Sequence, residues 1–298
     1  MAVDPYVILG SAVVGALVGL TGAGGGALMT PMLIFLFSVK APTAISSDLV
    51  AALVMRPFGA AIHMRSRNVN LRLVAWMACG SVPAAFAGSY LLHLLGRTDP
   101  SQRYVEMALG AALLLGAAAM GVRRVLDARS GRNRLAAVGD VTVRPLHTLF
   151  IGAVGGLIVG LTSVGAGSLM IVLLMFLYPT LGAGGLVGTD LTQAIPLTAA
   201  AALGAVLFGH VAVPVTASIV AGAVPAVIAG SLLSSRVPDR YLRPVITVVI
   251  LASGLKYIGV GSGELGVALL VMLVLLGAVL VTRLRSAPRL AAVTLPSE

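Results

Sequence analysis

One glycine-rich stretch occurs twice in this sequence, each time between apolar runs. Residues 19–29 read GLTGAGGGALM, and the stretch returns 141 positions later as GLTSVGAGSLM over residues 160–170, with seven of eleven paired positions identical. A glycine cluster within an apolar segment interrupts a helix and bares main-chain groups, which hydrocarbon tolerates only where they face protein or a water-filled cavity. The flanking apolar runs are too short to be comfortable membrane spans. Two interruptions at matching places in two halves of a chain are typical of a carrier's substrate site.

Composition places the chain in a membrane. Of its 298 residues, 58% are hydrophobic and 10% are charged, whereas a soluble domain carries about 25% charged residues. Because the first residues lack a basic region and a cleavage site, we expect residues 6–20 to be a membrane segment rather than a signal peptide. The sequence therefore predicts an all-α polytopic membrane protein. Its apolar segments cover about residues 6–21, 27–39, 44–63, 70–96, 103–122, 146–162, 167–178, 185–209, 211–234, 241–258 and 264–282.

The repeat extends well beyond the glycines. Ser47-Asp48-Leu49 pairs with Thr189-Asp190-Leu191, and residues 80–91 match residues 222–233 at eight of twelve positions. This agreement indicates an internal duplication rather than apolar coincidence. We divide the chain into a first repeat (1–122), a basic cytoplasmic linker (123–145), a second repeat (146–260), and an extra C-terminal helix with a tail (261–298).

The basic residues predict the topology. If each short pair of segments returns to the side on which it began, 15 of the 20 Lys and Arg residues lie on one side and only Lys40, Arg97 and Arg103 on the other. If each pair crossed once, this bias would vanish. Because positive loops stay in the cytoplasm, we expect the N-terminus outside and the C-terminus inside. The net charge of +10 then needs no nucleic-acid partner.

This topology also orients the two repeats. An odd number of crossings in each half turns the second copy upside down relative to the first. The fold we predict therefore has two inverted-topology repeats with glycine-broken short helix pairs, which is the architecture of alternating-access carriers.

The glycine stretches are the first candidate site. The N-terminus of a helix that follows an interruption presents free N–H groups and a partial positive charge, which suit an anion. The candidates for binding a small anion are Gly22, Gly24, Gly25 and Gly26, with Gly165 and Gly167 in the second copy, and the hydroxyls of Thr21, Thr162, Ser163 and Ser168. The alternative is helix packing, which is the simpler interpretation of the outer pairs Gly15/Gly19 and Gly156/Gly160.

Two acidic residues occupy matching positions near the starts of long segments. Asp48 lies early in 44–63 and Asp190 lies early in 185–209. Each could cap its helix, or face the cavity and carry a coupling proton, since acids within a membrane usually serve function. Gln193, one turn after Asp190, is a candidate polar contact to the substrate.

Arg56 is the most informative single residue. It lies eight positions after Asp48, about 12 Å along a helix, and so is expected near mid-membrane. Pro57 follows it and should kink the helix. An arginine at this depth needs a partner, which an anionic substrate would supply. A structural ion pair with Asp48 or Asp190 is the alternative.

Residues for catalysis are harder to find. No spacing of His, Cys, Asp or Glu matches a metal site, and Cys79 stands alone. We expect neither enzyme activity nor a cofactor or metal. The alternatives to a carrier are a non-transporting membrane scaffold and an intramembrane enzyme. The enzyme would need a nucleophile–base pair that the sequence does not offer.

With these motifs the chain resembles the TauE/SafE family, the sulfite exporter or anion permease group. The resemblance rests on residues 19–29 with Pro31, on their echo at 160–170, and on VGTDL at 187–191, and it covers about residues 6–260. It implies a multi-pass permease of the bacterial inner membrane that moves sulfite, sulfonates or related small sulfur-containing anions, usually outward. The second copy departs from the pattern, since Ser163 stands in place of Gly22. Whether both copies contribute equally is therefore open.

An anionic cargo agrees with the energetics. An inside-negative potential favours exit of an anion by about 2.3 kcal/mol per charge per 100 mV, so export could run without a coupling ion. The expected partners are the small anion and the lipid bilayer. A homodimer is a further expectation, for which the lone segment 264–282 could supply an interface, unless this segment simply sets the final topology.

Overall fold

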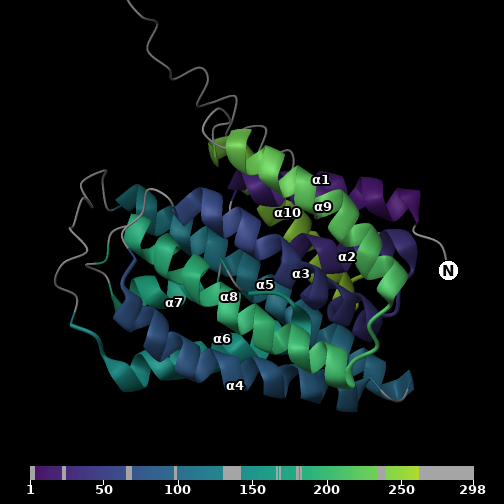
Figure 1. The fold of residues 1–298 in the computed structure, drawn as a ribbon, viewed down its shortest axis with the longest axis horizontal. Helices are drawn as coiled ribbons and strands as arrows, with labels where there is room; N and C mark the ends of the chain where they lie inside the picture. The colour runs from purple at the N-terminus through teal and green to yellow at the C-terminus, as the bar shows by residue number, and fades with distance from the viewer. Residues whose placement is uncertain are drawn as a thin grey trace, which may run out of the picture.

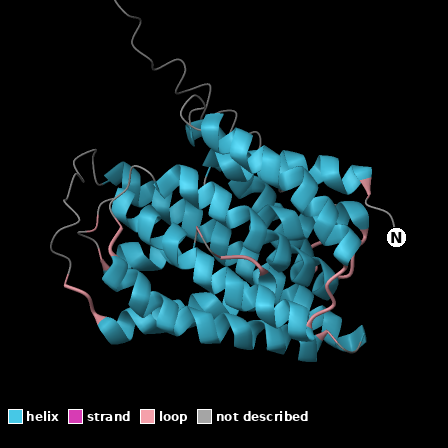
Figure 2. Ribbon diagram, in the orientation of Figure 1, coloured by secondary structure: helices cyan, strands magenta, loops and turns pink. Residues whose placement is uncertain are grey.

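The computed structural model describes residues 4–21, 25–64, 69–96, 99–129, 142–165, 167, 169–178, 181, 183–233 and 239–261. Within these residues the chain forms ten helices and no strand (Figure 2). The helices, in chain order, are α1 (Pro5–Thr21), α2 (Gly26–Phe37), α3 (Ala41–Met64), α4 (Leu71–Leu95), α5 (Asp99–Arg129), α6 (Pro145–Thr162), α7 (Leu169–Leu177), α8 (Ala183–Phe208), α9 (Val213–Leu233) and α10 (Asp239–Tyr257). The all-helical fold expected from the sequence is confirmed, and the expected helix at 264–282 lies outside the described residues.

Five of the described helices are long and apolar enough to cross a membrane: 71–95, 102–123, 145–162, 185–208 and 213–233. Helix α2 has 12 residues and α7 has nine, so they extend only about 18 and 14 Å. These two are short, as expected. The expectation that both helices beside each interruption would be short is wrong for α6, whose 18 residues reach the length of a span.

The helices beside each interruption form antiparallel hairpins. A Cβ placed on Gly10 of α1 would lie 3.4 Å from the ring of Phe37, the last residue of α2, and one on Gly25 would lie 3.8 Å from Val18, near the end of α1. In the second half, the hydroxyls of Thr148 in α6 and Tyr178 after α7 lie 2.5 Å apart. Each pair therefore returns to the end of the molecule where it began, which is the geometry assumed in counting the basic loops.

Two outer helix pairs pack through glycine in the same way. Helix α4 lies against α6, and α1 lies against α9, on opposite sides of the bundle (Figure 1). A Cβ on Gly80 would lie 2.1 Å from the carbonyl oxygen of Leu149, and one on Gly222 would lie 2.1 Å from that of Ile8. The packing interpretation is confirmed for the outer glycines, since added Cβ atoms at these positions would also meet the facing main chain: Gly15, Gly19, Gly156 and Gly160. The helices of each pair pack closely because glycine at these positions lets the facing main chains approach.

Helices α3 and α8, which are counterparts in the duplication, pack against each other and run antiparallel. Arg56 of α3 contacts Thr198 of α8. A Cβ on Gly209, just after α8, would lie 2.6 Å from Oγ of Ser46 in the second turn of α3. The counterparts α5 and α10 are also antiparallel, since Gly110 lies beside Tyr257 and Gly254 lies beside Leu114.

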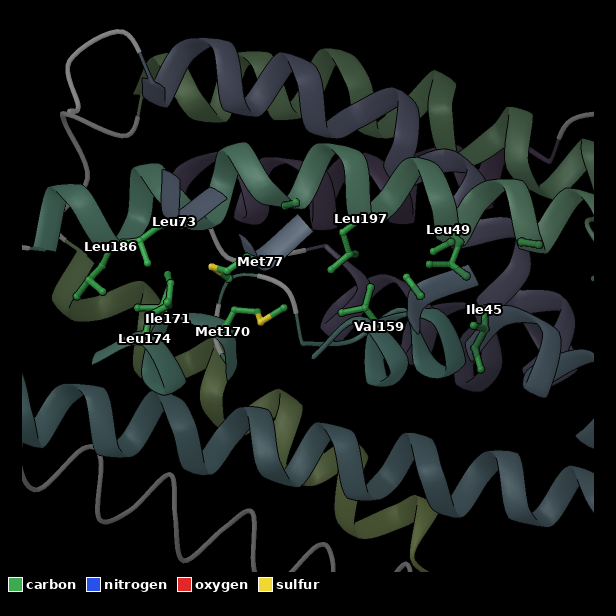
Figure 3. Packing of buried hydrophobic residues seen from close by; sticks show 14 of the residues in the cluster. Ile45, Leu49, Leu73, Met77, Val159, Met170, Ile171, Leu174, Leu186 and Leu197 are labelled. Atoms are coloured by element: carbon green, nitrogen blue, oxygen red, sulfur yellow. The ribbon is translucent and has the colours of Figure 1, made fainter. Parts of the chain in front are cut away.

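Apolar side chains fill the space around α3 in two clusters. Ile45 and Leu49 belong to a cluster with α4, α6, α7 and α8, whereas Met55 belongs to one with α1, α2, α5, α9 and α10. Figure 3 shows the first cluster, in which Ile171 and Leu174 of α7 lie near Leu186 of α8. Helix α3 is therefore held from both sides, and its polar residues are fixed between the clusters.

Candidate anion site between the helix interruptions

The two helix interruptions touch each other. Gly26, the first residue of α2, lies so close to the second interruption that a Cβ on it would be 1.8 Å from the carbonyl oxygen of Ser163. Ser163 ends α6 with a φ of 60°, in the left-handed region. A residue other than glycine rarely adopts this conformation, and it tends to mark a functional or tightly constrained position. The close contact therefore requires glycine at position 26.

Asp48 joins the two interruptions. One carboxylate oxygen, Oδ2, accepts hydrogen bonds from Thr30 Oγ1 of α2 at 2.8 Å and from Ser163 Oγ at 2.9 Å. The side chain is fully buried. Because α3 begins at Ala41, Asp48 lies two turns inside its helix. The expectation that it could cap α3 is wrong, since the helix starts earlier than its apolar run does.

Asp190 makes a related contact in the second half. The main-chain N–H of Gly167 donates to its carboxylate, and Gly167 has a φ of 96° that suits only glycine well. Asp190 is 1% exposed and lies two turns inside α8, which begins at Ala183. It therefore does not cap its own helix either. Instead it binds the backbone just before α7.

Arg56 lies where the two halves meet, in the middle of α3. Its Nη1 donates to the carbonyl oxygen of Ala194 at 3.3 Å and to the hydroxyl of Thr198. Thr198 is the counterpart of Arg56 in the duplication, so the pair joins equivalent positions of α3 and α8. Both Asp190 and Asp48 attract the guanidinium electrostatically. Arg56 is half-buried, so part of its surface stays open.

Gln193 lies on the same face of α8 as Asp190, one turn further on. Its Nε2 donates to Oγ of Ser81 in α4 at 2.6 Å, and both side chains are fully buried. The amide of Gln193 thereby ties α8 to the α4–α6 pair. Its oxygen, Oε1, meets no donor among the described residues.

The other predicted site residues lie in different settings. The hydroxyls of Thr21 and Thr162 donate to carbonyl oxygens one turn earlier in their own helices, those of Leu17 and Ile158. Gly25 forms the N-cap of α2, which has no side-chain cap, and Gly165 accepts the first hydrogen bonds of α7. The predicted residues Gly22, Gly24 and Ser168 lie outside the described residues.

Two residues of the site were missed by sequence reasoning. Thr30 binds Asp48, and Ser81 binds Gln193. Ser81 belongs to the repeated stretch 80–91, and a polar residue inside so apolar a repeat was an available signal. Thr30 directly follows the first glycine-rich stretch, so its position was also suggestive.

Together these groups form a polar centre with one cation and two carboxylates beside two interrupted helices. Such a centre can attract a small anion to Arg56 while the carboxylates limit how strongly it is held. Among the described residues no group of three or more His, Cys, Asp or Glu side chains could hold a metal ion.

Comparison with known proteins identifies the family. The family model described as sulfite exporter TauE/SafE matches residues 7–257. The chain belongs to the TauE/SafE family. Within this family it is 40% identical over 253 residues to the probable membrane transporter protein YjnA of Bacillus subtilis (strain 168), a match that covers 85% of this chain and 98% of the relative. No solved structure matches it. The resemblance stated from the sequence is confirmed, and the protein is a membrane transporter of the TauE/SafE family.

Proposed function

We propose that the protein is a secondary carrier that exports a small sulfur-containing anion, such as sulfite or an organosulfonate, across the bacterial inner membrane. The observation that carries this proposal is the position of Arg56. It is half-buried in the middle of a helix, where it bonds across to the counterpart position Thr198 at the contact between the two halves. A cation at this depth is costly without an anion. Asp48 and Asp190 attract Arg56 from nearby, but its hydrogen bonds go to Ala194 and Thr198, and the carried anion is the direct partner that we assign to it.

The packing of the halves supports alternating access. Helices α3 and α8 are counterparts and run antiparallel, as do α5 and α10. Counterparts that run in opposite directions are what inverted-topology repeats produce. We infer that the two halves rock about the contact between α3 and α8, where Arg56 would face one side of the membrane and then the other.

Two further arguments support export. Basic residues gather at the ends of the helices that we place in the cytoplasm. The inside-negative potential then drives an anion outward by about 2.3 kcal/mol per charge per 100 mV. Asp48 and Asp190 are the residues to which we assign any coupling proton, since both are buried carboxylates beside the interruptions.

The test is anion flux in liposomes that contain the purified protein. We expect it to move sulfite and small sulfonates, and Arg56→Ala to lose at least 90% of that flux while remaining folded. Arg56→Lys should retain part of it, because a lysine keeps the charge but not the planar donor pair. The matched control is Lys256→Ala, since Lys256 is exposed and lies 4.3 Å above the Phe35 ring. Normal flux in a folded Arg56→Ala variant would remove Arg56 from the site.

A further inference from the structure

Beside Arg56 the structure buries carboxylate and amide oxygens that have no donor. Oδ1 of Asp190, Oε1 of Gln193 and Oδ1 of Asp48 meet no hydrogen-bond partner among the described residues, and the three side chains are at most 1% exposed. Buried polar atoms in native proteins are nearly always hydrogen-bonded, and each exception calls for an explanation. All three of these atoms are acceptors, so a hydrogen-bond donor satisfies them.

Two of these acceptors lie one turn apart on α8, the helix that meets Arg56. Asp190 and Gln193 are three residues apart, and Ala194, whose carbonyl oxygen accepts from Arg56, follows one turn after Asp190. Residues three and four apart on a helix are neighbours. Asp48 lies apart from this pair, on α3, and it attracts Arg56 less than Asp190 does. The Asp190–Gln193 pair is therefore the acceptor pair that we place beside the anion.

The charges around Arg56 also favour a ligand that brings a hydrogen-bond donor. Asp48 and Asp190 both already interact with Arg56. An anion that offered only acceptors would add a further negative group beside two carboxylates and satisfy neither free oxygen. An anion with a hydroxyl or acid hydrogen would place its charge on Arg56 and its donor on the acceptor pair. Hydrogen bonds to charged acceptors are about twice as strong as neutral ones.

We propose that the site selects anions that carry their own hydrogen-bond donor. The ligands are singly charged anions such as hydrogensulfite or a hydroxyalkanesulfonate, in preference to the sulfite dianion or a plain alkanesulfonate. Arg56 binds the sulfur oxyanion, and Asp190 and Gln193 accept the donor. This inference rests on the proposed anion transport.

The test compares two sulfonates of equal charge and equal heavy-atom count, 2-hydroxyethanesulfonate and propane-1-sulfonate, which differ by a hydroxyl in place of a methyl. In proteoliposomes we expect the hydroxylated anion to be carried about tenfold better at subsaturating concentration, the discrimination that one hydrogen bond to a buried acceptor gives. Asp190→Asn should reduce the ratio to about threefold or less. The amide oxygen can keep the Gly167 bond, which leaves an NH₂ donor where the free oxygen was.

Gln193 provides a matched pair of variants. Gln193→Met removes the acceptor at nearly constant volume and should lower the ratio, whereas Gln193→Glu keeps an acceptor oxygen there and should preserve it. Equal transport of the two sulfonates by the wild type would overturn the inference and leave anion transport standing. Lack of flux for every sulfonate and for sulfite would instead overturn the proposed function. A ratio unchanged in both Asp190→Asn and Gln193→Met would show that other groups select the donor.

Discussion

Gly26 is the residue whose replacement the structure tolerates least. The atom that an added Cβ would meet at 1.8 Å is a main-chain oxygen, that of Ser163, so no side-chain rotation can relieve the clash. We expect Gly26→Ala to lower stability by at least about 3 kcal/mol, measured as a fall in the unfolding temperature in detergent, and to abolish flux.

The neighbouring glycine gives the control for that prediction. A Cβ on Gly25 would lie 3.4 Å from the flexible end of Met55, and Gly25 has an ordinary helical φ of −59°. Gly25→Ala should therefore change stability by no more than about 1 kcal/mol. If Gly26→Ala were as stable as Gly25→Ala, the contact between the two interruptions would not exist as described.

Asp48 links the two halves, because it accepts hydrogen bonds from Thr30 of the first half and from Ser163 of the second. Asp48→Ala leaves two buried hydroxyls without their acceptor and is expected to cost about 2–4 kcal/mol. Ser163→Ala removes a single donor and should cost about 1 kcal/mol. Thermal unfolding of the two variants and of the double variant tests the bond, since linked residues give non-additive losses. Stability losses that add strictly in the double variant would contradict the hydrogen bond between Asp48 and Ser163.

At the scale of elements, the glycine faces of α4–α6 and α1–α9 determine how closely these helices pack. A Cβ on Gly160 would lie 2.1 Å from the carbonyl oxygen of Ala85, whereas a Cβ on Gly121 of α5 would meet nothing within 4 Å. We expect Gly160→Ala to lose about 2–3 kcal/mol. Gly121→Ala should gain up to about 1 kcal/mol, because alanine is the better helix former. Unfolding temperatures that moved in the same direction for both variants would contradict this packing.

The helices themselves were largely predictable from the sequence. Apolar runs located all ten described helices, and the short run at 27–39 predicted a helix that could not cross the membrane. The apolar run places the start of α3 at residue 44, which is too late, because Thr43 in the first turn of the helix interrupts the run. Pro42, which favours the first turn of a helix, was the signal that could have corrected it. A helix that starts at Ala41 places Asp48 too far inside to be its N-cap.

The site was predictable only in part, because its partners come from distant segments. Arg56, Asp48 and Asp190 stand out as charges in apolar runs, and the duplication pairs the two acids. The bond between Ser81 and Gln193 joins residues 112 positions apart. A serine in a membrane helix can equally bond its own preceding turn, so no local pattern indicates which choice it makes. The packing of α4 against α8 brings Ser81 to Gln193 and so determines this hydrogen bond.

At the scale of the whole molecule, outer helices of each repeat pack against helices of the other repeat. Helix α1 of the first repeat packs on α9 of the second, and α6 of the second packs on α4 of the first. Neither repeat buries its own glycine faces, so each depends on the other to complete its packing. In this arrangement Gly26 of the first interruption lies against Ser163 of the second. The packing also determines which helix ends share a face of the molecule.

The membrane orientation that we propose combines those helix ends with the positions of the basic residues, and it gives the last prediction. The return of the hairpin α6–α7 places Arg144, at its start, on the face opposite His210, which follows α8. With Cys79 replaced by Ala, single cysteines at Lys40 and His210, both exposed, should react with a membrane-impermeant maleimide added to intact cells. A cysteine at the exposed Arg144 should react only after the membrane is opened. Were α6 and α7 instead one broken helix that crosses once, His210 and Arg144 would lie on the same side. Labelling of both from outside, or of neither, would therefore exclude the returning hairpin and with it the inverted arrangement of the two halves. Labelling of Arg144 alone would keep the hairpin and reverse the proposed orientation, which would remove the charge argument for export.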